Sequence, residues 1–168
     1  MNDGILDKKA FAAIHDLKND AVRLSRHVDR LADIAAGCGV SDRDEVIRAF
    51  LREYDVFLIK YENSVNDKIR AFIVEIKSII TAHKSELAGI GLDADGEGRI
   101  SILDEDCMIK GMGADDSEQD SAFNMLNEAL LNAEVHMERF IPEKYLSYDR
   151  QRDYRILKQE GNIYTKEV

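Results

Sequence analysis

Apolar side chains recur at alternating intervals of three and four residues along three stretches of the chain. These stretches are residues 7–36, 41–88 and 117–142. The spacing places the apolar residues on one side of a helix, so it predicts three long amphipathic segments. The middle stretch is either one helix or two helices broken near Asn63, because residues 62–67 are poor helix formers.

The first stretch has the most regular pattern. Its small and apolar residues repeat every seven positions, which gives a narrow apolar stripe. Gly37 and Gly39 follow the stripe and predict the end of a helix, because glycine adopts the left-handed conformation of a C-cap. We interpret the segment as a helix docked within one bundle, and an intermolecular coiled coil is the alternative. The stripe consists of Ala10, Ile14, Leu17, Ala21, Leu24, Val28, Leu31 and Ala35.

Glycines interrupt the pattern between the second and third stretches, at positions 89, 91, 96 and 98. Ile90 and Leu92 alternate with other residues before an Asp-Gly turn, and Ile100 and Ile102 do so after it. Alternation on both sides of such a turn predicts a short β-hairpin.

These features together predict a mainly α fold. We expect an antiparallel bundle of three or four helices with one short β-hairpin near residues 90–103. The length of 168 residues fits a single domain. In this interpretation residues 1–142 form the bundle, and residues 143–168 form a tyrosine-rich, charged tail that packs on it.

The net charge of −10 is concentrated in one segment. Residues 93–120 contain ten acidic and two basic residues, a net charge of −8. Acidic chains repel phosphate backbones and anionic lipid surfaces, so we expect neither nucleic acid nor membrane as a partner. The acidic segment indicates a cation site, a basic partner or a solvated loop.

The acidic segment contains a possible calcium loop of twelve residues. Carboxylates stand at loop positions 1, 3, 5 and 12, glycine at 6 and serine at 9, and a hard cation prefers such oxygen ligands. The sequence departs from the usual pattern at positions 5 and 12, and glycines interrupt the preceding helix. Calcium binding is therefore the alternative to a hairpin turn whose acids face water. The candidate ligands are Asp93, Asp95, Glu97, Ser101 and Asp104.

No arrangement typical of a catalytic site stands out in the sequence. The histidines lie in separate segments, and the sequence contains neither a phosphate-binding glycine loop nor a nucleophile elbow. We therefore expect a protein that is not an enzyme and has no cofactor, calcium excepted. Amphipathic tyrosines in the tail are candidates for binding a protein partner. They are Tyr145, Tyr148, Tyr154 and Tyr164.

Several short motifs follow one another between residues 46 and 108. They are Phe50-Leu-Arg-Glu-Tyr54, a helix over Ile69–Leu87, Ile90-Gly91-Leu92, Asp93-Ala-Asp95-Gly96, and Ile102-Leu103-Asp104-Glu105. In this order they resemble the C-terminal region of the bacterial flagellar filament-capping protein, a hook-associated protein. The hairpin here is longer, because of Glu97-Gly98, and the large insertion domains of that family are absent.

The resemblance implies a helical part of an assembly that has no catalytic site. It also implies self-association or a protein partner, and export without a cleaved signal by the flagellar apparatus. The N-terminal residues do not form a signal peptide, so a cytoplasmic location is the other expectation. A stand-alone relative of the capping proteins, with a different role, is the alternative to capping itself.

Overall fold

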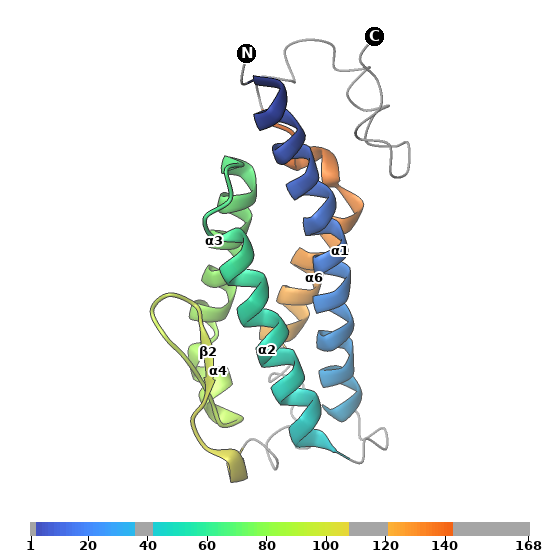
Figure 1. The fold of residues 1–168 in the computed structure, drawn as a ribbon. Coiled ribbons are helices and arrows are strands. Elements are labelled where there is room, and N and C mark those ends of the chain that lie inside the picture. Colours follow the sequence, from blue (N-terminus) through green and yellow to red (C-terminus); the bar gives the residue numbers. More distant parts are fainter. Residues whose placement is uncertain (1–2, 36–41, 108–120, 143–168) are drawn as a thin grey trace.

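The computed structural model describes residues 3–35, 42–107 and 121–142 of the chain. Four long helices in these residues form an antiparallel bundle (Figure 1), which confirms the predicted fold class. Helix α1 packs against α2 and α6, and α3 packs against α6 and α2. The four helices are α1 (Asp3–Ala35), α2 (Arg43–Tyr61), α3 (Asp67–Ala82) and α6 (Ser121–Val135).

The stretch 41–88 contains more than one helix, and its first break lies close to Asn63. Helix α2 ends at Tyr61, and Asn66 caps α3 by accepting hydrogen bonds from the backbone N–H groups of Lys68 and Ile69. The side chain of Asn66 is buried and also donates to the carbonyl of Phe140, at 2.8 Å. A buried cap of this kind fixes the position of the turn, because its amide has partners on two sides.

A second break, which the sequence pattern did not predict, lies at His83. The ring atom Nδ1 of His83 is 2.7 Å from the carbonyl oxygen of Ile79, and a short helix, α4 (Lys84–Gly89), follows. Two strands come next, β1 (Leu92–Ala94) and β2 (Ile100–Ile102), and they pair antiparallel with Asp93 opposite Ser101. The predicted hairpin near 90–103 is therefore confirmed.

The core contains the apolar stripes that the sequence pattern identified. Leu24, Phe57, Ile76 and Leu130 are all at most 3% exposed, one on each of the four long helices. Val65, an apolar residue of the stretch 41–88, is exposed, because it lies in the turn between α2 and α3 rather than on a helix. The stripes explain the bundle, since each helix buries one apolar face against its neighbours.

The last helix ends earlier than the sequence predicted. We expected a helix up to Pro142, but α6 ends at Val135 and one turn of 3-10 helix, η1 (Met137–Phe140), follows. This turn places the ring of Phe140 against that of Phe72, with ring centroids 5.4 Å apart. The free energy gained by burying Phe140 against α3 therefore exceeds the free energy that a continued helix α6 would gain.

Candidate functional site

The hairpin is the segment to which the sequence assigned a site, and its turn has a defined geometry. The backbone N–H of Gly98 donates to the carbonyl of Asp95, and the N–H of Asp95 donates to the carbonyl of Arg99. Gly98 has a φ of +73°, so the loop is a β-turn followed by a residue in the left-handed conformation. Oδ1 of Asp95 accepts the N–H groups of Glu97 and Arg99, at 2.8 and 2.9 Å. These hydrogen bonds lower the pKa of Asp95, the bond from Arg99 contributing most.

Contacts with α2 and α3 fix the hairpin to the bundle. The hydroxyl of Tyr54 on α2 donates to the carbonyl of Gly98 at 2.7 Å, and burial raises the pKa of this phenol. A Cβ atom at Gly98 would lie only 2.7 Å from the backbone Cα of Lys77 on α3. Arg99 forms an ion pair of 2.8 Å with Asp55 and one of 3.4 Å with Glu62. The hairpin therefore has a fixed position beside α2 and α3.

The five predicted calcium ligands lie along the hairpin, and the structure does not bring them together around one point. Asp93 is on β1, 3.4 Å from Lys84, and Ser101 is opposite it on β2. Asp95 is in the turn at one end, and Glu97 beside it is exposed. Asp104 lies beyond the other end, where its Oδ1 accepts the N–H of Cys107 at 3.0 Å. The ion pair and the hydrogen bonds already occupy three of the four carboxylates.

No group of three or more His, Cys, Asp or Glu side chains that could hold a metal ion is found in residues 3–35, 42–107 and 121–142. Calcium binding by residues 93–104 stays a prediction of the sequence. The four tail tyrosines, Tyr145, Tyr148, Tyr154 and Tyr164, and the tail 143–168 as a whole lie outside the described residues. Their role in binding a partner also stays a prediction.

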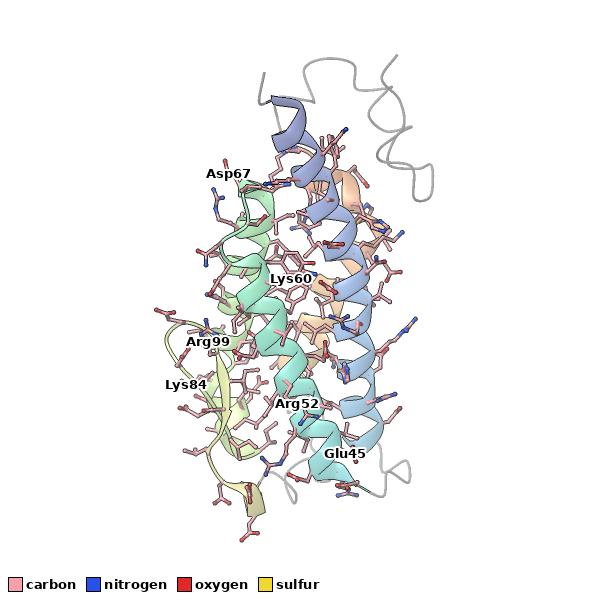
Figure 2. The ribbon with its side chains drawn as sticks, viewed as in Figure 1. Glu45, Arg52, Lys60, Asp67, Lys84 and Arg99 are labelled. Atoms are coloured by element: carbon pink, nitrogen blue, oxygen red, sulfur yellow. The ribbon has the colours of Figure 1, made fainter. Side chains whose placement is uncertain are left out.

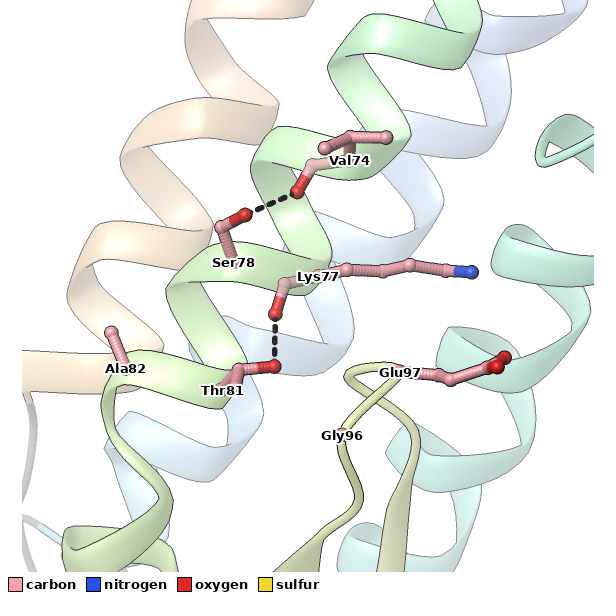
Figure 3. A pocket seen from close by; sticks show the side chains of 7 residues that line it. All are labelled: Val74, Lys77, Ser78, Thr81, Ala82, Gly96 and Glu97. Atoms are coloured by element: carbon pink, nitrogen blue, oxygen red, sulfur yellow. Dashed lines mark hydrogen bonds between the residues drawn. The ribbon is translucent and has the colours of Figure 1, made fainter.

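Two depressions border the hairpin. The first, which we call the α3 groove, encloses about 500 Å³ between α3 and the tip of the hairpin. Figure 3 shows that the hydroxyls of Ser78 and Thr81 point back to carbonyls of their own helix, so they are already hydrogen-bonded. The two hydroxyl protons of the groove are therefore already used, and its charged side chains are Lys77 and Glu97. Its lining is Val74, Lys77, Ser78, Thr81, Ala82, Gly96 and Glu97.

The second depression, which we call the β2 groove, lies between α2 and β2 and encloses about 470 Å³. It combines an apolar wall with charged groups. Arg52 lies on its α2 side and Arg99 on its hairpin side (Figure 2). Asp55 already pairs with Arg99, as described above. The lining is Leu51, Arg52, Asp55, Asp95, Arg99, Ile100 and Ser101.

A buried carboxylate joins α1 to α2, and the sequence pattern gave no sign of it. Asp20 is 7% exposed, and its Oδ2 accepts hydrogen bonds of 2.6 Å from both Lys60 and Tyr61. Burial by itself raises the pKa of Asp20, but the hydrogen bonds from Lys60 and Tyr61 outweigh it, so the net pKa is lowered. Arg23 pairs with Oδ1 of Asp20 at 3.0 Å. Lys60 and Tyr61 of α2 hold that helix to Asp20 of α1, so we assign the cluster a structural role.

Large apolar side chains are exposed on the outer faces of two helices. Val56 and Ile59 of α2 are 52% and 54% exposed, and they are three positions apart, on one face. Leu131 and Val135 of α6 are 44% and 69% exposed and four positions apart. A single exposed apolar residue is ordinary, whereas neighbouring ones form a patch that another protein can cover.

Comparison of the chain with protein-family models, with curated proteins and with solved structures finds no match in any of the three. Within the part of the chain that the structure describes, no helix has the length and apolar character needed to cross a membrane. The site is therefore interpreted from its own geometry.

Proposed function

We propose that this chain is a non-enzymatic assembly or protein-interaction module. The observation that carries the proposal is the pair of exposed apolar patches on α2 and α6. We call them the α2 patch (Val56 and Ile59) and the α6 patch (Leu131 and Val135). Helices that associate through such i, i+3 and i, i+4 residues gain by burying apolar area, at about 25 cal/mol per Å².

The surroundings of each patch also suit a protein interface. Arg52 and Lys60 flank the α2 patch on the same helix, and Figure 2 shows both side chains. Asn124, Glu128 and Asn132 are exposed beside the α6 patch. An apolar centre surrounded by polar groups is the usual anatomy of a protein interface.

The resemblance of residues 46–108 to the C-terminal region of flagellar filament-capping proteins supports the same class of function. Those proteins work as parts of an assembly, so the resemblance favours self-association, with a flagellar component as the other candidate partner. A stand-alone relative in a different assembly is the alternative.

Sedimentation velocity from micromolar to millimolar protein tests the proposal. We expect the weight-average mass of the chain to rise with concentration. Replacing both residues of the α2 patch by lysine, in Val56→Lys/Ile59→Lys, should shift this rise to higher concentration, because charges would have to be desolvated at the contact. The α6 double variant Leu131→Lys/Val135→Lys tests the second patch in the same way.

Val65→Lys is the matched control. Val65 is 64% exposed but lies in the turn between α2 and α3, away from both patches. It should leave the association unchanged. A chain that stays monomeric at every concentration and binds no flagellar component would contradict the proposal.

A further inference from the structure

One edge of strand β2 is not paired with any other strand of the residues that the structure describes; we call it the open edge. Hydrogen bonds just beyond the two strands join Asp95 to Arg99 at one end of the hairpin and Leu103 to Gly91 at the other. Hydrogen-bonded and non-bonded pairs alternate along an antiparallel ladder, so the N–H and C=O groups of Ile100 and Ile102 point away from β1. Within the described residues these four groups have no hydrogen-bond partner.

The two edges of the hairpin have different surroundings. β1 lies against α4, and both Leu92 and Ala94 are fully buried. β2 borders the β2 groove, where about 470 Å³ of space separates it from Leu51 and Arg52 of α2. Binding sites commonly enclose about 300–1,000 Å³, and an added strand lies about 4.8 Å from its neighbour. The open edge therefore faces a space that suits a short extended segment.

Side chains of a strand added to β2 would alternate between two different surfaces. Ile100 and Ile102 point toward the bundle and are partly buried against the core, and Leu51 beside them is also partly buried. Ser101 and Leu103 point outward and are exposed. An added strand would therefore bury every second side chain against apolar groups and leave the others at the surface.

The hairpin segment that carries this edge is acidic, although Arg52 of α2 also lines the β2 groove. Residues 93–107 contain six acidic residues and one basic residue, Arg99, whose guanidinium already pairs with Asp55 and Glu62. Asp104, Glu105 and Asp106 directly follow the strand and are exposed, and Glu105 forms an ion pair with Arg48 of α2. Natural proteins often protect an open edge with lysine or proline, and β2 has neither. Basic side chains on the outward positions of an incoming strand would complement this charge.

We propose that the edge of β2 binds an extended, basic segment of a partner protein, which adds to the hairpin as a third strand in the β2 groove. Apolar residues of the segment face Leu51, Ile100 and Ile102, and its lysine or arginine residues face the acidic surface. This inference rests on the proposed role in protein interaction, and it names a surface separate from the α2 and α6 patches.

Titration of the full chain with a blocked synthetic peptide of alternating lysine and valine tests this inference. In two-dimensional NMR we expect the amide signals of Ile100 and Ile102 to shift and their hydrogen exchange to slow, because both N–H groups gain acceptors. A matched peptide with glutamate in place of lysine should bind at least about tenfold more weakly. Added salt should weaken the binding of the lysine peptide, since salt screens the exposed charges.

Two variants locate the contact. Ile102→Pro removes one outward N–H but no hydrogen bond between β1 and β2, so it should abolish binding. Glu97→Lys/Asp106→Lys reverses two exposed charges and leaves the edge unchanged, so it should weaken binding about tenfold. Circular dichroism verifies that both variants are folded.

Equal binding of the two peptides, or shifts confined to residues outside 91–107, would overturn the inference. Absence of binding by a chain that still self-associates would overturn it and leave the proposed function standing. Absence of both binding and self-association would contradict the two proposals together.

Discussion

Gly98 and Gly96 lie two positions apart in the same turn, and we predict that only the replacement of Gly98 by alanine destabilises the protein. Gly98 has a φ of +73°, and an added Cβ would lie 2.7–2.8 Å from the backbone Cα and O of Lys77. No atom lies within 4 Å of a Cβ added at Gly96. Gly98→Ala should therefore destabilise the protein, whereas Gly96→Ala should be close to neutral.

The expected magnitude follows from two separate losses. A residue with a side chain in the left-handed region costs about 1–2 kcal/mol. The collision with Lys77 also moves the carbonyl of Gly98 away from the buried hydroxyl of Tyr54, which costs about 1–3 kcal/mol when a hydroxyl loses its partner. Together these losses amount to about 3 kcal/mol, and the melting temperature should fall by roughly 6–12 °C.

Urea denaturation, monitored by circular dichroism, gives the free energy of unfolding of both variants and of the wild type. Tyr54→Phe adds a second test. If the alanine at position 98 already breaks the hydrogen bond, the effects of Tyr54→Phe and Gly98→Ala should not add. The reasoning fails if Gly98→Ala and Gly96→Ala have free energies of unfolding within about 0.5 kcal/mol of each other.

Three further predictions concern the buried polar groups and the acidic loop. The folded state lowers the pKa of Asp20, so the ionised carboxylate stabilises the protein above the ordinary pKa of 3.8, and this stabilisation is lost as the pH falls below that value. The stability of Asp20→Asn, measured by urea denaturation against pH, should not show this loss in acid. A variant whose stability falls in acid as the wild type's does would contradict the prediction. Asn66→Ala removes the cap of α3 and the partner of the Phe140 carbonyl, so urea denaturation should show a loss of about 1–3 kcal/mol, with the exposed Asn63→Ala as the neutral control. Because Asp95 and Asp104 already accept backbone N–H groups, calorimetry should show no heat with millimolar calcium, and heat that Asp93→Ala abolishes would refute this.

The apolar pattern predicted the helices well because an apolar stripe depends only on the spacing of residues that are close together in the sequence. The break after Tyr61 was within reach, since asparagine and serine favour caps and turns over helix interiors. The apolar pattern gave no sign of the break at His83. The break at His136 was out of reach because it depends on a residue far along the chain. At His136 the chain changes direction so that Phe140 can pack on Phe72. The spacing of apolar residues does not predict this contact.

The candidate site was harder to predict for a related reason. The calcium prediction used the spacing of carboxylates along the loop, but spacing does not show which carboxylates are already hydrogen-bonded. The groups that fix the hairpin, Tyr54 and Asp55, lie 44 positions from their partners Gly98 and Arg99. Gly98, the glycine at position 6 of the predicted calcium loop, is held by its close approach to Lys77, whereas Gly96 has open space around it. The spacing along the loop does not reveal this contact with α3.

The contacts of α2 explain why the edge of β2 is a better binding surface than an isolated hairpin would be. A two-stranded hairpin by itself is at most marginally stable in water. Here Tyr54 and Asp55 hold the turn on one side of α2, while Lys60 and Tyr61 join the same helix to Asp20 of α1. The strand is thus ordered before a partner arrives, and only the incoming segment loses conformational entropy on binding. Loosening the turn through Gly98→Ala should therefore weaken peptide binding at Ile100 and Ile102 even though residue 98 makes no contact with the added strand.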